Sequence, residues 1–107
     1  LLKVEILNTK DIAYAKLGDY KSFKIQENQS LKQWCENYAN SDKKVDMEII
    51  NNINILNKKF HTNLQDLVDA NSNKEANETL NKKAKEVEID TFKIFTNLNN
   101  IKVNKRS

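Results

Sequence analysis

The chain contains 107 residues, of which 38% are hydrophobic and 31% charged, and its formal net charge at pH 7 is +3. A chain of this length can build one modest hydrophobic core, which predicts a single domain over residues 1–107. Because the sequence has no proline and one glycine, collagen-like and turn-rich all-β architectures are excluded. Its single cysteine excludes an internal disulfide framework and a zinc site made of clustered cysteines.

The excess positive charge lies at the C-terminal end. Residues 1–101 contain fifteen lysines and fifteen acidic residues, so the surplus falls in a basic tail at 102–107. The last two residues, Arg106 and Ser107, are typical of a cloning scar. A nucleic-acid-binding domain usually carries a basic stripe or patch, and the balance of charge over 1–101 does not indicate one.

No segment approaches the roughly 18 consecutive apolar residues that a transmembrane helix needs, so we expect a soluble protein without a membrane span. The chain begins at Leu1 rather than at methionine, which indicates either a mature form after signal cleavage or an excised domain. A cytoplasmic protein and a secreted protein without disulfides both agree with the single cysteine.

The first part of the chain, over 1–27, predicts a small β ribbon. Apolar and polar residues alternate over 2–7 and again over 20–26, which is the period of a strand. The segment 9–17 between them predicts a short helix capped by Thr9, and a strand over 12–17 is the competing prediction. Because an isolated two-stranded ribbon is only marginally stable, pairing of the two strands requires a helix packed against them.

From residue 30 onward the apolar residues follow a helical period. A short helix is predicted over 30–40, with an apolar face formed by Leu31, Trp34, Cys35 and Tyr38. Uninterrupted apolar stripes over 43–69 and 75–101 predict two long helices, and the asparagine-rich stretch 70–74 predicts the loop between them. Such a short connection makes these helices an antiparallel hairpin, over 42–101. The predicted fold class is therefore mainly α, with a long antiparallel helical hairpin, a shorter helix and a small N-terminal β ribbon.

Each long helix also carries apolar residues outside its main stripe. Ile50 and Ile55 lie off the stripe of the first helix, and Phe92 and Phe95 broaden the stripe of the second. A two-helix hairpin cannot cover such wide apolar faces by itself, so we expect these four residues to dock a helix of a partner protein or a second copy of the chain. Periodicity alone does not distinguish a docking face from core, and the same residues are equally consistent with core.

Groups suited to catalysis or metal binding are scarce. His61 is the only histidine and has no cysteine close to it in sequence, while Cys35 lies on an apolar face, where a buried free cysteine is ordinary. Glu86 and Asp90 share a helical face, but a carboxylate metal site in a bundle needs a second, facing pair. One glycine excludes a phosphate-binding loop, and no catalytic triad can be assembled. We therefore expect a non-enzymatic protein with no cofactor, no bound metal and no small-molecule substrate.

Residues 22–60 carry a resemblance to a known family. The alternating segment Ser22-Phe23-Lys24-Ile25-Gln26 precedes the predicted helix over 30–40, and Lys43-Lys44-Val45-Asp46-Met47-Glu48-Ile49-Ile50 follows it. This arrangement resembles the ribbon-helix-helix DNA-binding fold of the Arc and methionine repressors.

The resemblance implies a dimer in which the two strands pair and enter the major groove of DNA. The side chains facing the bases would be Ser22, Lys24 and Gln26. Those near phosphate would be Ser41, Lys43 and Lys44. A small dimeric DNA-binding regulator or accessory protein is therefore the alternative function, and nucleic acid is a predicted partner only under that alternative.

Overall fold

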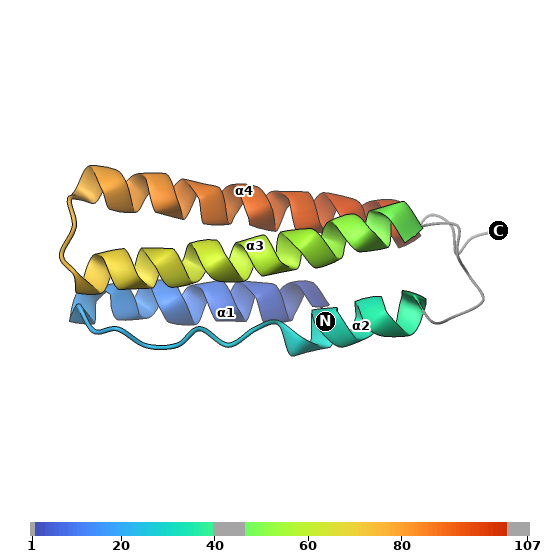
Figure 1. Cartoon of the computed structure of the whole chain (residues 1–107), viewed down its shortest axis with the longest axis horizontal. Coiled ribbons are helices and arrows are strands. Elements are labelled where there is room, and N and C mark those ends of the chain that lie inside the picture. The colour runs from blue at the N-terminus through green and yellow to red at the C-terminus, as the bar shows by residue number, and fades with distance from the viewer. Residues whose placement is uncertain (1, 40–46, 103–107) are drawn as a thin grey trace.

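The computed structural model describes residues 2–39 and 47–102, and within these ranges it is mainly helical without any β-strand. In chain order the elements are α1 (Leu2–Lys16), a short 3-10 helix η1 (Leu17–Asp19), α2 (Gln29–Ala39), α3 (Met47–Ser72) and α4 (Asn77–Lys102). The helices form an elongated bundle 50 Å long and 21 by 18 Å across (Figure 1). The prediction of a mainly α fold is confirmed, and none of the described helices is long and apolar enough to cross a membrane.

The predicted long hairpin is present as α3 and α4, which run antiparallel along the whole bundle (Figure 1). Each helix contains 26 residues, or about 39 Å. The connection spans 73–76 rather than the predicted 70–74. The part of the predicted hairpin before Met47, and the basic tail beyond Lys102, lie outside the described residues.

The late end of α3 is explained by a helix cap that the sequence pattern does not reveal. Glu75 N donates to Ala70 O at 3.0 Å, and Lys74 N donates to Asn71 O at 2.9 Å. Lys74 adopts a left-handed conformation, with φ of 58°. These contacts form a Schellman-type cap, which satisfies carbonyl groups of the last turn and lets the helix continue into the asparagine-rich stretch.

The predicted strand over 2–7 is wrong, because these residues form the first part of α1. Ile6 and Ala13, two turns apart on one face, are both 0% exposed, whereas Val4 is 52% exposed. Since α1 carries apolar residues on its buried and exposed sides alike, the alternation arises around a helix and not across the two faces of a strand. The helix predicted over 9–17 falls within α1 and η1, but Thr9 lies inside α1 rather than at its cap.

Long polar side chains tie α1 to α4. Glu88 accepts hydrogen bonds from Lys10 Nζ at 3.0 Å and from Tyr14 Oη at 2.7 Å, and Lys3 Nζ donates to Asn99 Oδ1 at 2.6 Å. Burial, and then the hydrogen bond to Glu88, raise the pKa of Tyr14 above its ordinary value. Partial burial of Glu88 opposes its ionisation, but the hydrogen bonds from Tyr14 and Lys10 and the charge of Lys10 outweigh it, so the pKa of Glu88 lies below its ordinary value.

The second half of the predicted ribbon, over 20–26, is not a strand of a sheet either. Its backbone hydrogen bonds are made by side chains of α3: Gln65 Oε1 accepts from Ile25 N, and Gln65 Nε2 donates to Phe23 O, both at 2.9 Å. His61 Nε2 lies 2.8 Å from Ile25 O. The amide of Gln65 therefore provides the acceptor and the donor that a neighbouring strand would provide, and the predicted N-terminal β ribbon is absent from the described residues.

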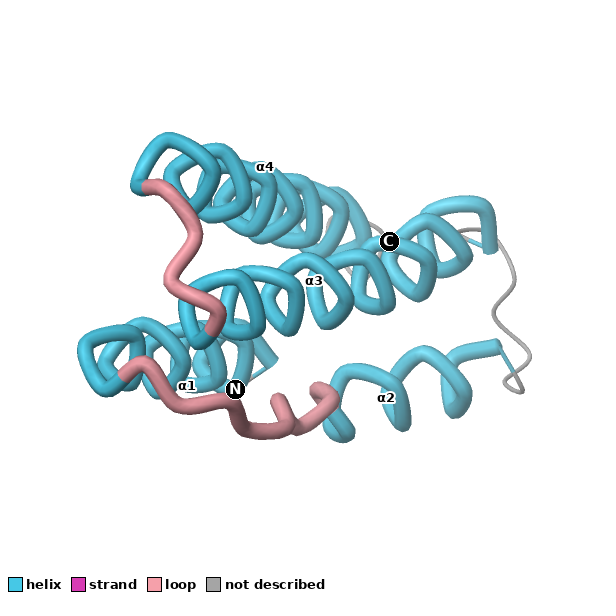
Figure 2. Tube along the Cα trace, turned by 60° about the vertical axis from the view of Figure 1, so that its left-hand side comes forward, coloured by secondary structure: helices cyan, strands magenta, loops and turns pink. Residues whose placement is uncertain are grey.

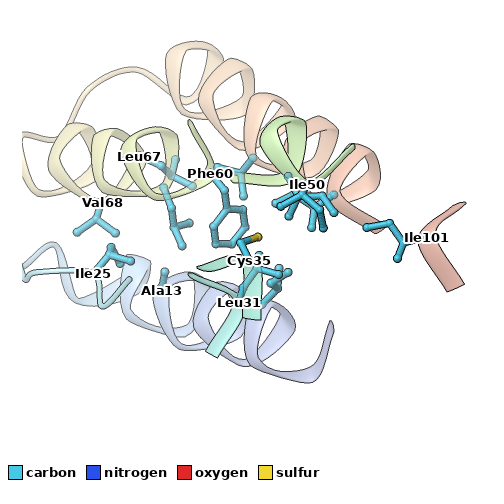
Figure 3. Packing of buried hydrophobic residues seen from close by; sticks show 14 residues of the cluster. Ala13, Ile25, Leu31, Cys35, Ile50, Phe60, Leu67, Val68 and Ile101 are labelled. Carbon is cyan, nitrogen blue, oxygen red and sulfur yellow. The ribbon is translucent and has the colours of Figure 1, made fainter. Parts of the chain in front are cut away.

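The hydrophobic core is centred on α3, which lies between α4 on one side and α1 with α2 on the other (Figures 1 and 2). Side chains from every long element enter it, and Figure 3 shows their packing. The buried members include Ile6, Leu31, Cys35, Ile50, Phe60, Leu64, Val87, Ile94 and Ile101. Because α3 is covered on two sides, its buried face is wider than the single stripe of a surface helix.

A buried polar contact positions the start of α2. Asn28, which directly precedes α2, is 2% exposed, and its Nδ2 donates to Oδ1 of Asn57 on α3 at 2.9 Å. Thr9 Oγ1 of α1 lies 3.0 Å from Asn28 Oδ1. Since buried polar groups need hydrogen-bond partners, these contacts join α1, α2 and α3 at one place.

Candidate protein-docking groove

A shallow groove of about 420 Å³ runs between α3 and α4. Its walls include Ile55, Leu56 and Lys59 from α3, and Phe92 and Lys93 from α4. Ile55 is 61% exposed and Phe92 is 71% exposed. Scattered exposed apolar residues are ordinary on protein surfaces, but these two come from different helices and line the same hollow.

The groove opens away from α1 and α2. Successive residues of an α-helix are about 100° apart, so Lys59 in the groove and His61 against the extended segment point to nearly opposite sides of α3. Ile89, one turn before Phe92 on α4, is 38% exposed and continues the apolar surface along that helix. We call the surface around this hollow, together with its continuation along the same two helices as far as Asp66 and Lys82, the α3–α4 groove.

A second hollow, of about 300 Å³, follows further along the same pair of helices. Lysines dominate its lining, which also contains two acidic residues: Lys82, Lys83, Lys85, Asp66 and Glu86. In the antiparallel hairpin α3 continues from the first hollow toward Asp66 while α4 runs back toward Lys82 (Figure 1). The α3–α4 groove therefore has two exposed large apolar side chains and two lysines at one end, and charged residues of both signs, with lysines in excess, at the other.

A buried carboxylate lies in the helix seam between these two hollows. Asp90 is 0% exposed, and its Oδ2 accepts a hydrogen bond from Asn63 Nδ2 at 2.6 Å. Its Oδ1 is buried without a hydrogen-bond partner among the described residues. Such an incompletely paired group weakens the fold relative to an apolar pair, while a single polar pair in an apolar seam disfavours shifted registers of the two helices.

The structure brings together two of the four predicted protein-binding residues, Ile55 and Phe92. Ile50 is 2% exposed and belongs to the core, so the prediction that it lies on a docking surface is wrong for this chain. Ile50 shares a helical face with Asn57, which contacts the start of α2, and that face is covered. Phe95 is half-buried against the core, with Lys3 Nζ 5.4 Å from its ring centroid, on the side of α4 that faces α1.

The resemblance to ribbon-helix-helix proteins is wrong. That fold requires a strand at 22–26, and the described residues contain no strand. Ser22, Lys24 and Gln26 are exposed on the extended segment, which is held by α3 instead of by a second chain. The predicted phosphate contacts lie outside the described residues: Ser41, Lys43 and Lys44. Comparisons with protein-family models, with curated proteins and with solved structures found no match for the chain.

The two side chains most suited to catalysis, Cys35 and His61, take part in packing and hydrogen bonding within the fold. Cys35 is 2% exposed, and burial, followed by the nearby charge of Glu36, raises the pKa of its thiol to about 11. His61 contacts the backbone oxygen of Ile25. Within the described ranges, no three side chains of histidine, cysteine, aspartate or glutamate are grouped in a way that could hold a metal ion.

The lysines of the α3–α4 groove were not predicted from the sequence. Lys59 lies four residues after Ile55, and Lys93 directly follows Phe92. Residues four apart lie on the same face of a helix, so the position of Lys59 beside Ile55 could have been predicted from the sequence. The position of Lys93 in the same groove could not have been predicted, because it depends on which sides of α3 and α4 pack together.

Proposed function

We propose that this protein is a non-enzymatic interaction module that docks a helix of another chain in the α3–α4 groove. The proposal rests on one observation, the convergence of the exposed side chains of Ile55 and Phe92 on a single hollow between two antiparallel helices. A partner helix that lays its apolar face into such a groove uses a common mode of recognition.

The exposed area of these two side chains sets the scale of the interaction. Full burial of an isoleucine or phenylalanine side chain contributes about 1.5–3 kcal/mol, and 61% of Ile55 and 71% of Phe92 remain exposed. Covering both would contribute roughly 2–4 kcal/mol, before the entropic cost of association is subtracted. The two residues are therefore expected to dominate binding without supplying all of it.

The test is a double substitution, Ile55→Ala with Phe92→Ala, in the full chain. Binding is measured by fluorescence anisotropy with a labelled amphipathic helical peptide of about 18 residues that carries leucines on one face, and self-association is measured by sedimentation velocity. We expect the double variant to lose binding or self-association by about tenfold or more, with its circular dichroism spectrum unchanged.

The matched control is Val4→Ala with Ile12→Ala on α1, because these residues are 52% and 57% exposed but lie outside the groove. The control variant should behave like the unmodified chain. The proposal is wrong if the unmodified chain binds no peptide and stays monomeric at high concentration. Equal loss in the control variant would also contradict it, because the groove would then have no special part in binding.

A further inference from the structure

Positive charge is concentrated along the α3–α4 groove. Its two hollows are lined by five lysines, Lys59, Lys82, Lys83, Lys85 and Lys93, against two carboxylates, those of Asp66 and Glu86, for a net charge of +3. The described residues as a whole contain fourteen lysines and thirteen acidic residues. The rest of the described surface is thus slightly acidic, and the groove is distinct from it.

None of these five lysines forms an ion pair with another described residue. Within the described ranges the one ion pair joins Lys10 of α1 to Glu88 of α4, outside the groove. Lysine stems lie along apolar surface while their ammonium groups remain in water. An occupant of the groove would therefore meet an apolar floor at Ile55 and Phe92, with unpaired positive charges beside it.

The charge pattern argues against a second copy of the chain as the occupant. In a two-fold symmetric dimer the same surface faces itself, so a groove with a net charge of +3 would face another groove with a net charge of +3. Like charges across an interface disfavour association. The exposed large apolar residues of α1 are Val4, Leu7 and Ile12, and the acidic residue exposed beside them is Asp11. One carboxylate is too little to balance the net charge of +3 on the groove, so the α1 surface of a second copy is a poor occupant.

We infer that the α3–α4 groove binds an acidic amphipathic helix of a different protein, an inference that rests on the docking function proposed above. The section of α3 from Asn52 to Asp66 lines both hollows and is about 21 Å long, which matches a partner helix of about four turns. Its apolar residues would cover Ile55 and Phe92. Its carboxylates would lie beside Lys59 and Lys93 and near the lysines of the second hollow.

The experiment compares two labelled helical peptides of about 18 residues with identical leucine faces, one with glutamates and the other with lysines on the polar face. Anisotropy titrations use the full chain at about 50 mM and about 300 mM salt. We expect the glutamate peptide to bind about tenfold tighter or more at low salt, with the difference shrinking at high salt because exposed charges are screened. The variant Lys59→Glu with Lys93→Glu should abolish or reverse this preference.

The control is Lys21→Glu with Lys24→Glu, which changes charge equally on the exposed part of the extended segment, away from the groove. It should leave the preference for the glutamate peptide intact. If both peptides bind equally and lose binding in the Ile55→Ala, Phe92→Ala variant, the inference is wrong while the docking function stands. If neither peptide binds but the chain self-associates through Ile55 and Phe92, the occupant is a second copy and the inference is wrong.

Stronger binding to vesicles containing phosphatidylserine than to the glutamate peptide would also overturn the inference, since the groove would then recognise an anionic membrane surface. If neither peptide nor vesicle binds and the chain remains monomeric, both the inference and the proposed function fail.

Discussion

The assignment of Ile50 to the core and Ile55 to the groove predicts very different costs for the same substitution. Ile→Ala removes three carbon atoms, and at about 0.8 kcal/mol per buried methylene this costs about 2.4 kcal/mol at Ile50, which is 2% exposed. The cavity left behind adds to this, for a total of about 2–5 kcal/mol. Ile55 is 61% exposed, so its substitution costs at most about 1 kcal/mol, and the higher helix propensity of alanine offsets part of that loss.

Thermal and urea unfolding, followed by circular dichroism, measure the two free energies. In a chain of this size each kcal/mol shifts the midpoint by about 4–8 °C, so the cost of about 2–5 kcal/mol for Ile50→Ala should lower it by roughly 10–40 °C, whereas Ile55→Ala should lower it by about 8 °C at most. The urea dependence of the unfolding free energy should be the same in both variants if the denatured states are alike. Equal destabilisation by both substitutions would refute the assigned faces of α3, and with them the position of the groove.

Two further predictions concern Gln65 of α3 and Cys35 of α2. Gln65→Ala removes two hydrogen bonds to the extended segment, each contributing about 0.5–1.5 kcal/mol. We therefore expect amide hydrogen exchange at Ile25 to accelerate by about tenfold to a hundredfold, while the helix amides keep their protection. Unchanged exchange at Ile25 would contradict the contact with Gln65. Because the pKa of Cys35 is raised from 9.0 to about 11, its thiolate fraction at pH 8 should fall about a hundredfold. Native Cys35 should therefore react with a disulfide reagent at least that much more slowly than the denatured chain, and similar rates in the two states would show that the thiol is accessible.

The long hairpin was predictable because it depends on local information. Two stretches of more than twenty residues without proline or glycine, each with apolar residues at helical spacing, leave little alternative to α3 and α4. The end of α3 was less predictable, since the cap depends on a left-handed conformation at Lys74, a residue type with no special preference for it.

Short alternating segments carry much less information than long helical ones. The alternation over 2–7 fits a strand as well as it fits a helix with apolar residues on two sides, and only packing of Ile6 into the shared core of the bundle selects the helix. The extended segment over 20–26 was predicted to need a neighbouring strand. In the folded chain the side-chain amide of Gln65, some forty residues later in the sequence, supplies those hydrogen bonds, and no local pattern indicates this contact.

The spacing of apolar residues was enough to predict that this chain is mainly helical, and that α3 and α4 carry more apolar surface than one narrow seam buries. Which part of that surface is core depends on how the helices pack against one another. Ile50 and Ile55 both lie off the main stripe, but they are five residues apart and therefore about 140° apart around α3. The side of Ile50 is buried in the core of the bundle, and the side of Ile55 is left open beside Phe92, because burial depends on which elements pack against a helix and not on the periodicity of the helix alone.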